Sequence, residues 1–118
     1  MAVNNDLGKL GEELGLAWLQ QHGYTILYRN WRHSFYELDL IAWKDNTVHV
    51  VEVKLRTSTT FGMPEEAVTR KKYRDLMKAA DRFLSLNPQY RYLQLDVLSI
   101  TQEAGDWVYF MIEDVFFN

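Results

Sequence analysis

The sequence predicts an α/β domain, in which a central mixed β-sheet is flanked by helices in the order αβββαββ. Two segments repeat apolar residues at helical spacing, at residues 5–21 and 69–86. Runs rich in β-branched and aromatic residues, which are typical of strands, lie at residues 24–31, 37–44, 47–54, 90–100 and 107–112. A chain of 118 residues is long enough for one sizeable core and too short for two, so we expect a single domain over residues 1–118.

The composition excludes several classes of site. The chain has no cysteine, which rules out disulfides, thiolate zinc sites and cysteine nucleophiles. Its histidines, at positions 22, 33 and 49, form no ligand pair at helical spacing, so zinc hydrolase patterns are absent. The N-terminus has no basic segment followed by an apolar run, and no stretch reaches membrane-spanning length. We therefore expect a cytoplasmic protein without membrane contacts.

In the first helix, a glutamate falls on an apolar stripe. The helix has Asn and Asp residues before it as N-caps and Gly23 as its stop signal. Glu12 shares helical spacing with Leu16 and Leu19, so its side chain is expected to point toward the core. The alternative is an ordinary exposed glutamate, which is the commoner situation for this residue type.

The strands at 37–44 and 47–54 are joined by Asp45 and Asn46, two residue types that tolerate positive φ. A two-residue hairpin loop at this point pairs Lys44 with Thr47 and so fixes the register of the two strands. A three-residue loop would give a different register.

With the two-residue loop, counting outward sets Asp39 opposite Glu52 and Glu37 opposite Lys54. Opposed residues have Cβ atoms about 4.5 to 5.5 Å apart, so the carboxylates of Asp39 and Glu52 would nearly touch. Two like charges at that distance need a cation between them, and a hard divalent ion such as Mg²⁺ suits oxygen ligands. Lys54 adds a positive charge that could hold a water or a phosphate oxygen beside the metal.

The alternative is an amphipathic hairpin whose solvent-facing side happens to carry acids and a lysine. Both faces of this hairpin are apolar, however, as strands buried between two layers are. One face is predicted to hold Ile41, Trp43, Val48 and Val50, and the other Leu38, Leu40, Ala42, Val51, Val53 and Leu55. Carboxylates in such strands would lie in a cleft, where an unpaired charge is costly.

The second helix is predicted to begin near Pro64 or, preferably, with Thr69 as its N-cap, and to end at Asn87. Its expected buried stripe is Tyr73, Leu76, Met77, Ala80, Phe83 and Leu84. Although the net charge is −3, basic residues bunch near the strands and on this helix. The candidates for nucleic-acid contacts are Arg32, Arg56, Lys71 and Lys72. Lys71, Lys78 and Arg82 lie opposite the apolar stripe, where plain solvent-facing surface is the alternative.

These residues together resemble a known family. The motifs are Gly8, Gly11-Glu12, Gly23-Tyr24, Arg29-Asn30, Glu37-Leu38-Asp39-Leu40-Ile41, Val51-Glu52-Val53-Lys54, Phe61-Gly62 and Glu66-Ala67-Val68. Over residues 7 to about 100 the chain resembles the YraN family of bacterial proteins, within the PD-(D/E)XK nuclease superfamily. That family is similar to archaeal Holliday junction resolvases, so the resemblance implies a restriction-endonuclease-like fold.

The resemblance also implies roles for individual residues. Asp39 and Glu52 match the metal-binding acids, Lys54 matches the catalytic lysine, and Glu12 matches the helix glutamate near the metal. The backbone carbonyl of Val53 would be a further metal ligand. The implied cofactor is Mg²⁺ or Mn²⁺, and a metal-bound water oriented by Lys54 would attack the phosphodiester.

Two positions depart from the pattern. Tyr36 stands where the family usually has glycine, and Lys72 stands where many superfamily members have glutamine. Two function classes stay open: a metal-dependent endonuclease acting on DNA, including branched or structured DNA, and a nucleic-acid- or protein-binding module that keeps the fold without useful catalysis. The Asp, Glu and Lys set favours the first class, whereas the acidic charge and Tyr36 favour the second. Resolution of a DNA junction requires two cuts, so an endonuclease that resolves junctions is expected to be a homodimer.

Overall fold

The computed structural model describes residues 2–57 and 68–116, with side chains from residue 7 onward. Its elements are α1 (Ala2–Gln21), β1 (Thr25–His33), β2 (Tyr36–Lys44), β3 (Thr47–Arg56), α2 (Arg70–Leu86), β4 (Leu93–Glu103) and β5 (Asp106–Ile112). The predicted α/β fold and the order αβββαββ are confirmed. In the described part of the chain, no helix is both long and apolar enough to cross a bilayer.

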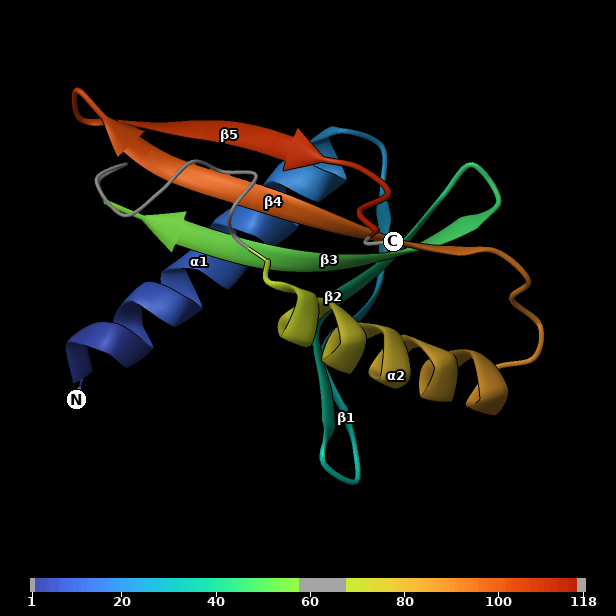
Figure 1. Ribbon diagram of the computed structural model, residues 1–118. Helices are drawn as coiled ribbons and strands as arrows, with labels where there is room; N and C mark the ends of the chain where they lie inside the picture. Colours follow the sequence, from blue (N-terminus) through green and yellow to red (C-terminus); the bar gives the residue numbers. More distant parts are fainter. Residues whose placement is uncertain (1, 58–67, 117–118) are drawn as a thin grey trace.

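The strands form one mixed sheet in the order β1-β2-β3-β4-β5. Neighbouring strands are antiparallel except β3 and β4, which are parallel and are connected through α2. A parallel pair needs such a crossover, because its strands must start at the same edge of the sheet. The helices α1 and α2 cover opposite faces of the sheet (Figure 1).

Each face of the sheet has its own hydrophobic core. The core under α2 consists of Leu38, Ile41, Val48, Val50, Leu76, Ala79, Ala80, Phe83 and Leu95. The core under α1 consists of Leu19, Tyr24, Leu40, Ala42, Val51, Leu98 and Ile100. The predicted placement of Leu38 beside Leu40 is therefore wrong, since the two side chains pack in different cores. Strict alternation does not hold at the start of β2, where this strand bends away from β3 (Figure 1).

The turn between β2 and β3 is the predicted two-residue loop. Asp45 and Asn46 have φ of 52° and 61°, as a type I′ turn requires, and Lys44 pairs with Thr47. The β2–β3 ladder then runs as far as Leu40 and Val51.

Beyond that pair, the strands part. Asp39 and Glu52 are the next residues on their strands, at the point of divergence. The predicted pairing of Glu37 with Lys54 is absent from this ladder. Instead, Glu37 pairs with Arg32 of β1 in the register and through an ion pair of 3.5 Å. The register is lost because the two strands diverge before Glu37 is reached.

The ends of α2 agree with its sequence signals. The Thr69 hydroxyl accepts a hydrogen bond from the N–H of Lys72 at 3.1 Å, and Asn87 is the C-cap. The predicted strand at 90–100 begins later, at Leu93, because the N–H of Tyr90 is used in a turn bond to the carbonyl of Asn87. The alternative start near Pro64 and the loop before it fall largely outside the described residues.

Helix α1 lies unusually close to β3 because glycines face the strand. A Cβ atom added at Gly15 would lie 3.0 Å from Val53 Cγ2, and one added at Gly11 would lie 3.1 Å from Leu55 Cβ. This close approach brings the first half of α1 over the end of β3 that carries Lys54.

Candidate functional site

The site begins where β2 and β3 diverge. Burial raises the pKa of Asp39 to about 7, and the charge and hydrogen bonding of Glu52 act in the same direction. Two groups partly oppose this shift: the N–H of Val53, which donates to Asp39 Oδ2 at 3.3 Å, and the charge of Lys72. The two predicted acids are therefore neighbours, and Glu52 disfavours the charged form of Asp39.

A pocket of about 390 Å³ opens between α1 and this divergence point. Its polar lining comes from Glu12, Asp39 and Lys54. Its remaining lining residues are Leu7, Gly8, Gly11, Val53 and Leu55. The structure thus brings a helix glutamate, a strand aspartate and a strand lysine to one cavity.

Glu52 faces the other helix. Its carboxylate lies 3.4 Å from Lys72 Nζ, and its side chain is only 7% exposed. The Thr69 cap fixes the first turn of α2, where Lys72 is located, so the helix start directs the ammonium group toward the acids. Lys72 is a predicted nucleic-acid contact, and its ion pair with Glu52 was not predicted from the sequence.

The donor set fits a magnesium ion that keeps several of its waters. Mg²⁺ in proteins is commonly held by one or two carboxylates, and Asp39 and Glu52 provide two that repel each other without a cation. A strand residue directs its N–H and C=O to the same edge, so the carbonyl of Val53 lies on the Asp39 side. Within the described residues, no group of three or more acidic or histidine side chains is close enough to hold a metal. Glu12 therefore lines the pocket without joining the acid pair.

Three of the four residues predicted to contact nucleic acid form ion pairs with acids. Lys72 contacts Glu52, whereas Arg32 is paired with Glu37 and Lys71 with Asp75, the latter at 2.9 Å. Arg56 is half-buried at the end of β3.

Sequence reasoning missed two groups of polar or aromatic residues. Lys78, predicted as plain surface, lines a cleft together with the exposed Phe35 of the β1–β2 turn.

The second group is a buried pair. His49 Nδ1 lies 2.7 Å from Asp96 Oδ2 inside the sheet, and both residues are buried. The second pair had a signal, since each residue interrupts an apolar strand. Because it is enclosed in the core, we interpret it as a structural pair.

Comparison with known proteins places the chain in a family. The model of the uncharacterised protein family UPF0102 matches residues 11–100. A UPF0102 protein of Bacteroides thetaiotaomicron is 39% identical over 117 residues, which cover 99% of this chain and 97% of that protein. A UPF0102 protein of Syntrophomonas wolfei is 46% identical over 104 residues, covering 87% and 90% of the two chains. A third, from Chloroherpeton thalassium, is 42% identical over 123 residues, covering 99% and 93%. The chain belongs to the UPF0102 family, which is also known as the YraN family.

Proposed function

We propose that this protein is a metal-dependent phosphodiesterase of the PD-(D/E)XK type that cleaves DNA, including branched or structured DNA. The observation that carries the proposal is the neighbouring pair Asp39 and Glu52, with Lys54 in the pocket beside Asp39. An acid such as Asp39, whose pKa is raised by burial and by a neighbouring carboxylate, is typical of functional sites. A location in the cytoplasm, where bacterial DNA is present, belongs to the same proposal.

Each side chain has a role in this proposal. Asp39 and Glu52 would hold Mg²⁺ or Mn²⁺, which when bound supplies charge to a phosphate and acidifies a water. Lys54 places an ammonium group in the same pocket, where it can orient a water or stabilise the charge of the scissile phosphate. Lys72 holds the carboxylate of Glu52 in position through its ion pair. Glu12, on the opposite wall of the pocket, can accept a hydrogen bond from a water.

One observation favours a second function, a binding module without useful catalysis. The ion pair between Lys72 and Glu52 neutralises one of the two metal-binding acids, which weakens the attraction for a cation. In that case the protein would bind nucleic acid or a protein partner and leave the phosphodiester intact.

Cleavage assays on branched, single-stranded and duplex DNA with magnesium or manganese test the proposal. Lys54→Ala should fold normally and lower the cleavage rate by about a hundredfold to a thousandfold, because the lysine acts on the transition state more than on DNA affinity. Lys9→Ala, which removes an exposed lysine of α1, serves as the matched control and should cut like wild type.

Two outcomes would contradict this proposal in different ways. Full activity in Lys54→Ala would remove that residue from the mechanism. Binding of DNA by the wild type without cleavage of any substrate would establish the binding module instead. A resolvase needs two active sites for two cuts, so cleavage of junctions would also require a homodimer in solution.

A further inference from the structure

We propose that the cleft between the β1–β2 turn and α2 binds the unpaired strand of the DNA substrate, with Phe35 and Tyr36 stacking on its bases. This inference rests on the proposed function, because it names the kind of DNA that reaches the acid pair. It assigns the specificity for single-stranded regions to residues outside the candidate active site.

The aromatic pair lies at the tip of a hairpin. His33 pairs with Tyr36 across a two-residue turn, and Ser34 has a φ of 57° in that turn. The turn leaves Phe35 83% exposed, which is more than any other large hydrophobic residue in the described part of the chain. The two rings are adjacent, with centroids 4.7 Å apart and planes tilted by 32°. The exposed Phe35 ring thus faces solvent, and the half-buried Tyr36 ring lies beside it.

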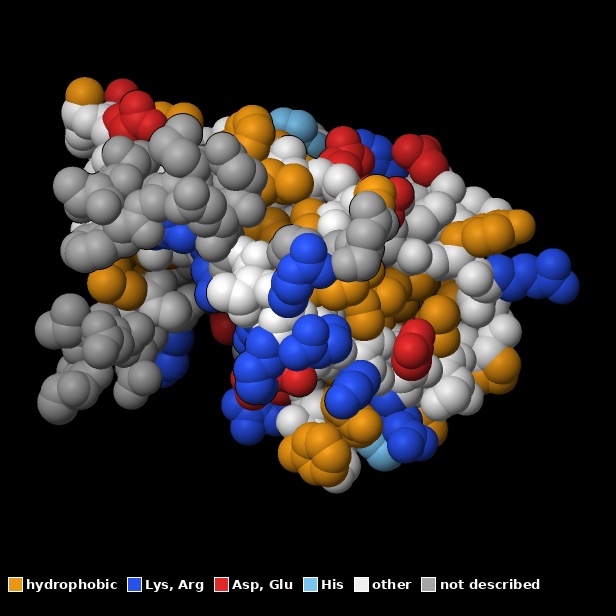
Figure 2. Space-filling view, in the orientation of Figure 1, with side chains coloured by type: hydrophobic (Ala, Val, Ile, Leu, Met, Phe, Trp, Pro, Cys, Tyr) orange, Lys and Arg blue, Asp and Glu red, His pale blue; other side chains and the backbone are white. Residues whose placement is uncertain are grey.

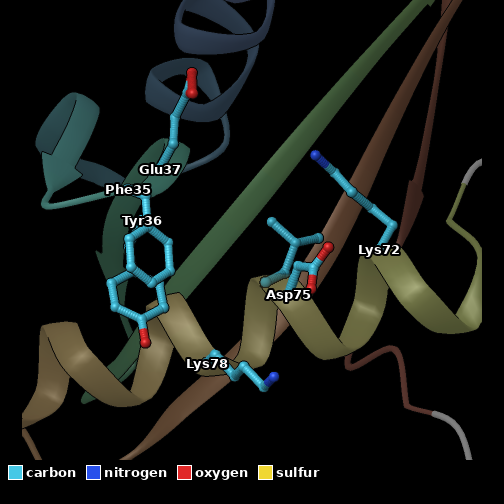
Figure 3. A pocket seen from close by; sticks show the side chains of 7 residues that line it. Phe35, Tyr36, Glu37, Lys72, Asp75 and Lys78 are labelled. Atoms are coloured by element: carbon cyan, nitrogen blue, oxygen red, sulfur yellow. The ribbon is translucent and has the colours of Figure 1, made fainter.

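The cleft beneath these rings has a volume of about 360 Å³. Figure 3 shows Phe35 and Tyr36 on the hairpin, across from the α2 residues Lys72, Asp75 and Lys78. A neighbouring hollow of about 410 Å³ shares Tyr36 and Lys78 as walls. The two hollows therefore continue along the exposed side of α2, which gives room for more than one nucleotide.

Two basic side chains along this path, Lys78 and Arg82, can contact a phosphate backbone. Lys78 has no ion pair within the described residues, and the Arg82 guanidinium lies 6.0 Å from the centre of the Tyr36 ring. The first hollow also has two acids, and both are paired with basic residues: Asp75 with Lys71, and Glu37 with Arg32. One further acid, Asp81, lines the second hollow. Figure 2 shows lysine and arginine side chains gathered over this side of the molecule, next to hydrophobic side chains.

The path also leads to the candidate active site. Lys72 lines the cleft, and the same side chain contacts Glu52 of the acid pair. A strand whose base stacks on Phe35 would therefore continue past Lys72 toward the metal-binding acids. In duplex DNA the base faces are covered by their neighbours, so only an unpaired nucleotide can stack on a protein ring in this way.

Fluorescence anisotropy tests this inference with a labelled oligothymidylate of about 15 nucleotides, near the site size of small single-strand binders. A blunt duplex is measured in parallel, and a metal chelator prevents cleavage. We expect Phe35→Ala to weaken single-strand binding by about fivefold to a hundredfold, the range for one lost stacking interaction, and to leave duplex binding unchanged. Phe35→Trp should retain single-strand affinity. Phe110→Ala is the matched control, because Phe110 is an exposed phenylalanine of β5.

The outcomes separate this inference from the proposed function. Equal single-strand affinities of wild type and Phe35→Ala would overturn the stacking role, even if the protein cuts DNA, and would leave the cleft to a protein partner. Single-strand binding that depends on Phe35, without cleavage of any DNA, would support the inference and contradict the enzyme. Absence of binding to every DNA form would overturn both.

Discussion

At Asp39, burial and the charge of Glu52 both disfavour the ionised carboxylate. The pKa of this residue is about 7 in the folded protein, against 3.8 for an unperturbed aspartate. Between these two values the folded state binds more protons than the unfolded state. The contribution of Asp39 to the free energy of unfolding is therefore largest below about pH 4 and falls as the pH rises toward 7.

Asp39→Asn should remove that pH dependence. In metal-free buffer near pH 8, we expect the variant to be as stable as wild type or more stable, because it relieves the repulsion with Glu52. Magnesium or manganese should raise the melting temperature of wild type and leave that of the variant unchanged, since only the wild type binds the ion in its folded state. Thermal denaturation at several pH values, with and without metal, checks both expectations.

The control for this comparison is Asp106→Asn, at an exposed aspartate at the start of β5. It should show the metal response and the pH dependence of wild type. An equal metal response in Asp39→Asn would exclude Asp39 as a ligand.

Single residues differ in how far the sequence could place them. The proximity of Asp39 and Glu52 was predictable, because the turn chemistry of Asp45-Asn46 sets the register between their strands. The contact of Lys72 with Glu52 was not, since it depends on how α2 docks on the sheet after a long connection. Periodicity describes one element at a time and carries no information on such docking.

At the scale of elements, the position of α1 depends on glycine. Gly11 and Gly15 allow the helix backbone to approach the side chains of Leu55 and Val53, and this approach brings Glu12 to the pocket of Lys54. Helix glycines are unfavourable by about 1 kcal/mol relative to alanine, so the contact has to offset that cost.

Gly15→Val should therefore destabilise the protein more than Gly8→Val does. Both substitutions place a β-branched residue inside α1, but a side chain at Gly15 meets Val53 and Leu98, whereas a Cβ atom at Gly8 has no neighbour within 4 Å. We expect the Gly15 variant to be less stable than the Gly8 variant by about 1 to 3 kcal/mol, the usual cost of overpacking. Urea denaturation of the two variants measures the difference, and equal values would show that α1 can shift freely on the sheet.

The order of elements was predictable from periodicity and caps, whereas some of their limits were not. The Thr69 cap and the apolar stripe fixed α2, and Leu76, Ala80 and Phe83 are buried as predicted. The first helix begins at Ala2 rather than at residue 5, because the preceding Ala, Val and Asn residues continue it. Leu38 lies on the opposite face from the predicted one. The prediction assumed the strict alternation of a regular ladder, whereas β2 twists where it diverges from β3.

At the scale of the whole molecule, the candidate site lies where both helix layers reach the same part of the sheet. Glu12 comes from α1 on one face and Lys72 from α2 on the other, and both lie near the divergence of β2 and β3. This arrangement follows from the path of the strands. β2 turns away from β3 beyond the end of their ladder, and the sheet is open next to the acid pair (Figure 1).

The net charge of −3 requires any phosphate-binding surface to be local, and this can be tested through salt dependence. In a plot of log affinity against log salt concentration, each neutralised phosphate of a single strand contributes roughly −0.7 to the slope. About three to five contacts therefore give a slope of about −2 to −3.5. Reversing Lys78 and Arg82 to glutamate should flatten this slope, because both line the hollows along α2. Reversing Lys9 and Arg91, which are exposed outside these hollows, changes the net charge by the same amount.

The paired reversals separate a local contact from a general effect of charge. Binding isotherms of the oligothymidylate at several salt concentrations give the slope for each variant. If the Lys78 and Arg82 variant alone loses affinity and slope, the strand follows α2. If both variants weaken binding equally, the association reflects the total charge, and phosphate contacts along α2 are excluded. Because phosphate contacts carry no sequence information, the effect of the α2 reversal should be the same for oligonucleotides of any base composition.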